Sequence, residues 1–152
     1  MANVSDLWFT SEGDFLVGYD CDLLLANDLD MLLQSIAIRV KTLPGEMALH
    51  PEVGVEMMDL IGAPMNEETL ALGEMLIYNN LTYDGLFNPD DITVAAAPIN
   101  KYQALFIVEV MAPELDRERL FVIPYDFQEG RVLTDEIHEV IGQSSVYTGG
   151  LL

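Results

Sequence analysis

The sequence predicts an α+β fold, with a small antiparallel or mixed sheet packed against two or three helices and extended terminal arms. Apolar residues recur every three or four positions in parts of the first eighty residues, which is helical spacing, whereas short β-branched or apolar runs separated by turn residues follow residue 91. The 152 residues, 51% of them hydrophobic, can form one core but not two. We therefore expect a single domain, with an N-terminal arm at 1–13, a globular core at 14–142 and a C-terminal tail at 143–152.

The first elements are expected to be two short strands and a helix. Residues 15–17 and 22–26 are strand candidates joined by a turn around 18–20. Asn27 or Asp28 can cap a helix over residues 29–43. Its buried stripe is expected to consist of Leu29, Leu32, Leu33, Ile36, Val40 and Leu43. Leu32, Ile36 and Val40 should face the sheet.

A junction with two proline and glycine pairs follows this helix. Pro44 ends the helix, and Gly45 supplies a backbone that can take a positive φ, so the chain should reverse here. Pro51 and Gly54 then precede a short apolar helix that ends near residue 62. Asn66 is expected to cap a third helix that runs to about residue 80.

The second half of the chain is expected to form a small meander. Its strands are predicted at residues 92–97, 104–110 and 120–123. A final short helix is predicted at 135–141, capped by Thr134.

One edge of this sheet is a candidate docking site for a strand of another protein. Pro124 follows the run 120–123 and cannot donate a ladder hydrogen bond, which favours an edge position or the end of the strand. A free edge can be covered by a strand of another subunit, or by the arm or tail of the same chain. The candidate edge residues are Ala104, Leu105, Phe106, Ile107, Val108, Leu120, Phe121, Val122 and Ile123.

The junction also carries a resemblance to a known family. The spacing of Thr42, Gly45, Glu46, Pro51 and Gly54 between two helices resembles that of the small baseplate wedge proteins of contractile-tailed phages, also called sheath initiators. The resemblance spans residues 15–110. This chain has Asn88, Pro89 and Asp90 where the family tends to have Glu-Pro-Arg, which puts in doubt any partner contact made through that arginine.

The resemblance implies a structural virion protein of the tail baseplate. Such a protein is made in the host cytoplasm, and its partners are other wedge proteins and tail sheath subunits, in multiple copies. The family is thought to offer a sheet that mimics a sheath subunit and accepts strands from the first sheath ring. The resemblance gives the five junction residues a structural role.

The charge balance excludes several classes of partner. The chain has 26 Asp and Glu against 6 Lys and Arg, a formal net charge of −20. The six cations are too few and too scattered for a nucleic-acid groove, and the negative charge disfavours anionic membranes. The apolar runs are far shorter than the roughly 20 residues of a bilayer span, and no signal peptide is evident, so a cytosolic product is expected. The excess of Asp and Glu either serves only to keep the protein soluble or attracts a partner with a basic surface.

A catalytic role has to be weighed because the family is sometimes labelled lysozyme-like. A glycosidase needs two carboxylates across the glycosidic bond, one of them with a raised pKa. Glu46 is the acid inside the turn at residues 42–46, and we expect it to cap amides or to meet Arg39 or Lys41. His50 and His138 are isolated, and no calcium or phosphate loop is present. We predict no catalytic, cofactor or metal site. The alternatives are a tail-associated peptidoglycan-cleaving glycosidase that uses Glu46 with an Asp, and an acidic assembly adaptor.

Overall fold

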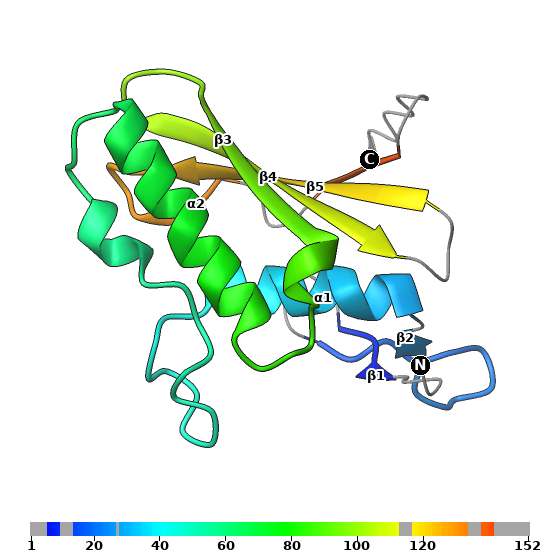
Figure 1. The fold of residues 1–152 in the computed structure, drawn as a ribbon. Coiled ribbons are helices and arrows are strands. Elements are labelled where there is room, and N and C mark those ends of the chain that lie inside the picture. Colours follow the sequence, from blue (N-terminus) through cyan, green and yellow to red (C-terminus); the bar gives the residue numbers. More distant parts are fainter. Residues whose placement is uncertain (1–5, 10–13, 27, 113–116, 134–137, 142–152) are drawn as a thin grey trace.

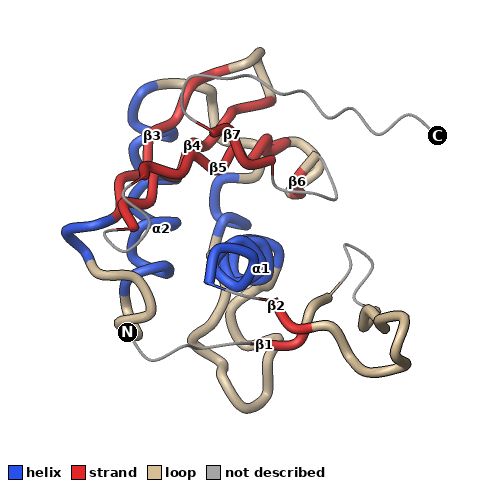
Figure 2. The backbone as a smooth tube through the Cα atoms, turned by 90° about the vertical axis from the view of Figure 1, so that its right-hand side faces the viewer, coloured by secondary structure: helices blue, strands red, loops and turns tan. Residues whose placement is uncertain are grey.

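The computed structural model describes residues 6–9, 14–26, 28–112, 117–133 and 138–141. It has an α+β fold, as the sequence predicts: a five-stranded antiparallel sheet with both α-helices on one face, and a separate two-stranded sheet (Figure 1). The view turned by 90° shows the five-stranded sheet on one side of α1 and the small sheet on the other (Figure 2). The elements in chain order are β1 Asp6–Leu7, β2 Leu25–Ala26, α1 Asp28–Lys41, the 3₁₀ turn η1 Met57–Leu60, α2 Glu67–Thr82, η2 Pro89–Asp91, β3 Ile92–Pro98, β4 Gln103–Ala112, β5 Arg117–Asp126, β6 Arg131–Val132 and β7 His138–Ile141.

The meander predicted from the second half of the chain is confirmed. Strands β3, β4 and β5 pair in sequence order, with Ala96 opposite Phe106 and Phe106 opposite Ile123. The far side of β5 pairs with β6 at one end and with β7 at the other. The strand order is therefore β3-β4-β5, followed by β6 and β7.

The core lies between the inner face of this sheet and the two helices. Alternate residues of β4 and β5 are buried there, among them Phe106 and Phe121, because successive side chains of a strand point to opposite faces. Ile77 and Leu81 of α2 belong to the same core. Gly73 lets α2 approach the sheet closely, since a Cβ on this residue would lie 2.7 Å from Cζ of Phe106.

The three residues of the first helix that were predicted to face the sheet contribute to this core, but Leu43, predicted in the same buried stripe, lies beyond the helix end and is 42% exposed. Ile36 and Val40 are buried in the core cluster, and Leu32 packs against it partly buried. The helix ends at Lys41, two residues before the predicted end, with a final hydrogen bond from the Thr42 amide to the Ile38 carbonyl (2.9 Å). The predicted cap of α2 is also confirmed: the Oδ1 of Asn66 accepts a hydrogen bond from the Thr69 amide (2.8 Å).

Residues 6–9 are not a free arm, in contrast to the prediction. Strand β1 pairs with β2, and the Gln34 side chain of α1 holds the segment through the Phe9 amide (2.8 Å) and the Leu7 carbonyl (3.1 Å). The predicted strand regions 15–17 and 22–26 form isolated bridges, Phe9 with Phe15 and Val17 with Leu23, in addition to β2. The side-chain amide of Gln34 in α1 thus fixes a segment that the sequence analysis assigned to the N-terminal arm.

The predicted C-terminal helix is wrong where the structure describes it. Residues 138–141 form β7, which pairs with residues 119–122 of β5, and residues 134–137 lie outside the described residues. The β-branched Val140 and Ile141 suit a strand, and the side of β5 away from β4 offers them ladder partners. Local spacing over a few residues does not reveal such a partner. Within the described residues, no helix is long and apolar enough to cross a bilayer.

Candidate functional site

The structure brings the five predicted junction residues together in one compact turn between α1 and η1. The Gly45 amide donates a hydrogen bond to the Pro51 carbonyl (2.7 Å), which closes the loop. The Glu46 carboxylate accepts a hydrogen bond from the Leu43 amide (3.0 Å), as expected for a residue that caps amides. The Thr42 carbonyl accepts a hydrogen bond from the Val55 amide (3.2 Å). The junction is therefore a closed backbone turn.

Gly54 is the tightest position of this turn. Its φ of +126° lies in a region that residues with a Cβ rarely adopt. A Cβ at this position would lie 2.6 Å from the Thr42 carbonyl oxygen and 2.8 Å from the Pro44 nitrogen. Both contacts are with backbone atoms, which cannot rotate away, so the close approach of the two halves of the junction requires glycine.

A buried arginine ties the junction to α2. Arg39 is 7% exposed, and its Nη1 donates a hydrogen bond to the Asn80 carbonyl (2.8 Å) while its Nη2 pairs with the Asp84 carboxylate. The Asn80 side chain in turn donates a hydrogen bond to the Gly54 carbonyl (2.6 Å). Of the partners expected for Glu46, a backbone amide, Arg39 or Lys41, the structure shows the amide, and the end of α2 at residue 82 brings Asp84 to Arg39.

The pKa of Asp84 reflects this contact. Partial burial acts to raise the pKa of the carboxyl, but the hydrogen bond from Arg39, with that from the Leu86 amide, outweighs burial and keeps the pKa below its usual value. The Asp84 carboxylate is therefore ionised at neutral pH and neutralises the buried guanidinium. These contacts assign the junction a structural role.

Three described carboxyls have clearly shifted pKa values, and the direction of the shift bears on glycosidase chemistry. A general acid needs a raised pKa, but the clearly shifted carboxyl pKa values among the described residues, those of Glu52, Asp84 and Asp126, are all lowered. Hydrogen bonds to the carboxylates cause these shifts. Glu52 accepts one from its own backbone amide, and Asp126 accepts one from the Gln103 side chain. In Asp84, partial burial acts to raise the pKa, but the hydrogen bond from Arg39 helps to lower it. The Glu46 carboxylate is exposed and bound to a backbone amide.

The predicted edge for a partner strand is not an edge. Strand β4, which contains Ala104, Leu105, Phe106, Ile107 and Val108, pairs with β3 on one side and β5 on the other. Strand β5, which contains Leu120, Phe121, Val122 and Ile123, is covered by β4, β6 and β7.

Pro124 is tolerated inside β5 for a positional reason. Its carbonyl accepts a hydrogen bond from the Leu133 amide (2.8 Å), so its backbone faces the β6 side. The β6 pairing begins at Tyr125 and the β7 pairing at Val122, so the missing N–H falls between these two pairings. The sequence around Pro124 does not show where the pairing of β5 with β6 and β7 begins or ends.

One edge of the described sheet is β3, a strand that the sequence analysis did not propose as the edge, and β6 and β7 form the other edge. Ile99, just beyond β3, donates an amide hydrogen bond to the Gln103 carbonyl (2.8 Å). In an antiparallel ladder the backbone N–H and C=O groups of alternate residues face the same partner, so those of the odd-numbered residues of β3 face β4. The backbone groups of Ile92, Val94 and Ala96 therefore face away from the sheet. The Ala96 amide donates a hydrogen bond to the Glu74 carboxylate of α2 (2.7 Å), which confirms this orientation.

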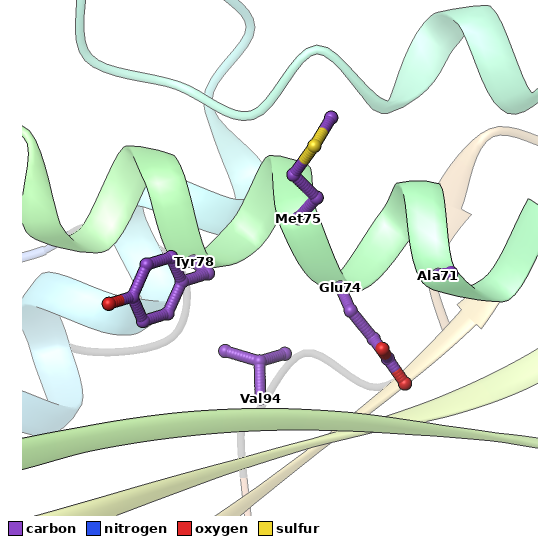
Figure 3. Close-up of a pocket in the computed structure, with 5 residues that line it drawn as sticks. All are labelled: Ala71, Glu74, Met75, Tyr78 and Val94. Atoms are coloured by element: carbon purple, nitrogen blue, oxygen red, sulfur yellow. The ribbon is translucent and has the colours of Figure 1, made fainter. Parts of the chain in front are cut away.

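A groove of about 240 Å³ lies between α2 and this edge, lined by Ala71, Glu74, Met75, Tyr78 and Val94. Figure 3 shows Val94 pointing toward α2 between Tyr78 and Glu74. Met75 is 50% exposed, and the Tyr78 hydroxyl donates a hydrogen bond to the Pro89 carbonyl (3.2 Å). The groove lining is therefore mixed, with apolar side chains, a tyrosine and one carboxylate.

The segment that builds the groove has no basic residue other than a histidine. Residues 42–100 contain ten Asp and Glu but no Lys or Arg, and they include all of α2, η2 and β3. Asp90 and Asp91 of η2 directly precede β3 in the chain. This charge distribution favours a cationic partner at the groove. Within the described residues, no group of three or more His, Cys, Asp or Glu could hold a metal ion.

Comparisons with known proteins give one informative similarity. No family model matches the sequence, and no curated protein matches it. The fold is similar to the crystal structure of a protein from Geobacter sulfurreducens that is proposed to be a tail lysozyme, with a TM-score of 0.57 and 22% sequence identity. The match covers 69% of this chain and 96% of that one. At this identity the similarity shows a shared fold.

Proposed function

We propose that the protein is a non-catalytic structural component of a contractile phage tail. In this proposal it belongs to the baseplate wedge and helps to initiate sheath assembly by accepting a strand of a sheath subunit at the free edge of β3. It would act within the virion, next to other wedge proteins, after synthesis in the host cytoplasm.

The observation that carries this proposal is the β3 edge, which has no partner strand on its outer side within the described residues and lies beside a groove lined by apolar side chains and the Glu74 carboxylate. The outward backbone groups of Ile92, Val94 and Ala96 can pair with an extended segment of another chain. The junction pattern of Thr42, Gly45, Glu46, Pro51 and Gly54 and the shared fold of the tail-related neighbour support the phage tail context.

Val94→Pro tests the strand-accepting edge. The Val94 amide faces away from β4, so proline should obstruct strand addition without removing a bond between β3 and β4. We expect the variant to melt close to the wild type and to lose nucleation of purified sheath on tail tubes, as seen by electron microscopy. Thr93→Ala, an exposed neighbour whose amide faces β4, should nucleate normally. Normal nucleation by a correctly folded Val94→Pro protein would contradict the proposal.

The alternative function, peptidoglycan cleavage, has its own test. We expect the purified protein to release no more muropeptide than a buffer control, because the carboxyls with a clearly shifted pKa, Glu52, Asp84 and Asp126, all have a lowered pKa, whereas a general acid needs a raised one. Glu46→Gln should cost at most about 1 kcal/mol of stability, since one exposed amide contact is weakened and not lost. Glycosidase activity that disappears in Glu46→Gln would establish the enzyme instead.

A further inference from the structure

The Glu74 carboxylate occupies the donor that an incoming strand would need. Its Oε1 lies 2.7 Å from the Ala96 nitrogen, and within the described residues it provides the side-chain hydrogen bond to the β3 edge. A charged side chain that reaches over a strand edge is a common device against unwanted strand pairing. Glu74 reaches the edge from α2, so it can leave without disturbing the ladder between β3 and β4.

The groove defines what a strand at this edge must carry. A strand added to β3 would continue the sheet, so every second side chain would point to the same face as Val94 and Ala96. The side chain beside Val94 would enter the groove between Ala71 and Tyr78, where an aliphatic group fits. Two residues along, the side chain beside Ala96 would meet the Glu74 carboxylate.

The charge of the surroundings decides the character of that second side chain. An incoming carbonyl that accepts the Ala96 amide would displace Glu74 and leave its carboxylate without this bond. A Lys or Arg from the incoming strand would restore a partner, whereas residues 42–100 supply neither. The acids of residues 42–100 would repel an acidic strand, and Lys101, in the turn after β3, is the next cation along the chain.

From this geometry we infer that Glu74 guards the β3 edge and selects the strand that opens it: an extended polypeptide segment with a Lys or Arg and an aliphatic residue two positions apart on its inward face. A carbonyl of the strand accepts the hydrogen bond of the Ala96 amide in place of Glu74. The Lys or Arg of the strand then pairs with the Glu74 carboxylate. This inference rests on the proposed function, because it specifies the partner of the same edge.

A synthetic peptide, Thr-Lys-Thr-Val-Thr-Val-Thr with blocked ends, tests the inference on the full chain. Titration into ¹⁵N-labelled protein should shift the amide signals of Ile92, Val94 and Ala96 and leave the junction unchanged. Replacing the peptide lysine with glutamate, or its central valine with proline, should weaken binding at least about tenfold. If the amide signal changes were spread over the acidic surface and the proline peptide bound as tightly as the original peptide, the β3 edge would not be the binding site.

Two variants of equal charge change separate selection from general attraction. Glu74→Lys should weaken binding of the lysine peptide at least about tenfold and strengthen binding of the glutamate peptide. Glu56→Lys, at an exposed position outside the groove, should change either affinity less than about threefold. Equal effects of the two variants would show that Glu74 selects nothing.

A third variant tests the guard. In Glu74→Ala the Ala96 amide should exchange with solvent at least about tenfold faster than in the wild type, while the amides that face β4 keep their rates. An unchanged exchange rate of the Ala96 amide would show that Glu74 does not protect the β3 edge. Peptide binding without sheath nucleation would leave this site intact and refute the initiator function. Nucleation that persists in Glu74→Lys and Val94→Pro would leave the initiator function intact and refute the β3 edge as its site.

Discussion

Gly54→Ala is expected to be the most damaging single methyl addition in the junction. The added Cβ would lie within 2.8 Å of backbone atoms of Thr42, Leu43 and Pro44, at a φ of +126°. Overpacking costs about 1–3 kcal/mol and an unfavourable backbone region about as much again, so we expect a loss of about 3 kcal/mol or more. For a chain of this size such a loss lowers the melting temperature by about 6–12 °C.

Gly45→Ala is the matched control for this prediction. Gly45 also has a positive φ, +82°, but a Cβ there would meet nothing within 4 Å. Only the left-handed backbone is then penalised, at about 1–2 kcal/mol. Chemical denaturation of both variants measures the difference. If Gly45→Ala is as destabilising as Gly54→Ala, the close approach in the junction is not what requires glycine at residue 54.

Asp84→Asn is expected to have the second large effect, because it leaves the buried Arg39 charge uncompensated. Only 8% of the Arg39 side chain is exposed. Removing one partner of a buried pair costs about 3–5 kcal/mol. Because Asp84 is itself 31% exposed and asparagine can still accept a hydrogen bond, we expect the lower end, about 3 kcal/mol, in urea denaturation at pH 7.

The exposed ion pair between Arg131 and Glu129 is the control for Asp84→Asn. The two side chains are 67% and 53% exposed, so Glu129→Gln should cost less than about 1 kcal/mol. Comparable losses in the two variants would contradict the importance of burial at Arg39.

The pH dependence of stability provides an independent measurement on Asp84. Its pKa is lower in the folded protein than the usual 3.8, so the unfolded chain binds a proton first as the pH falls. The contribution of the pair is therefore fully present above the unfolded pKa and is lost as the pH falls through the folded pKa. Asp84→Asn should remove this part of the acid dependence. An unchanged acid profile in the variant would show that Asp84 does not carry it.

The sequence by itself determined the features that depend on neighbours in the chain. Asn66 caps α2 because its side chain reaches an amide three residues away. Ile36 and Val40 share a buried face because they are four residues apart on a helix. The turn at Gly45, the three-strand meander and the capping by Glu46 follow from equally local chemistry, and the α+β class follows from where these patterns change.

Only the tertiary structure decided which strand edge is free. Leu120, Phe121, Val122 and Ile123 precede a proline and look like an edge, but β6 and β7 return to cover that side of β5. The four residues of β7, predicted as a helix, became a strand because β5 offered hydrogen-bond partners. A short segment of mixed propensity takes the structure that its long-range partner provides.

The candidate site has the same origin. Glu74 and Ala96 are 22 residues apart, and Arg39 and Asp84 are 45 apart, so neither contact is visible as a sequence motif. The sequence supplied the acids and the absence of Lys and Arg over residues 42–100, a charge balance that fits either solubility alone or a basic partner. The position of that partner depends on which backbone amides point outward from β3, and this is set by the ladder register between strands, a property of the folded sheet and not of any one segment.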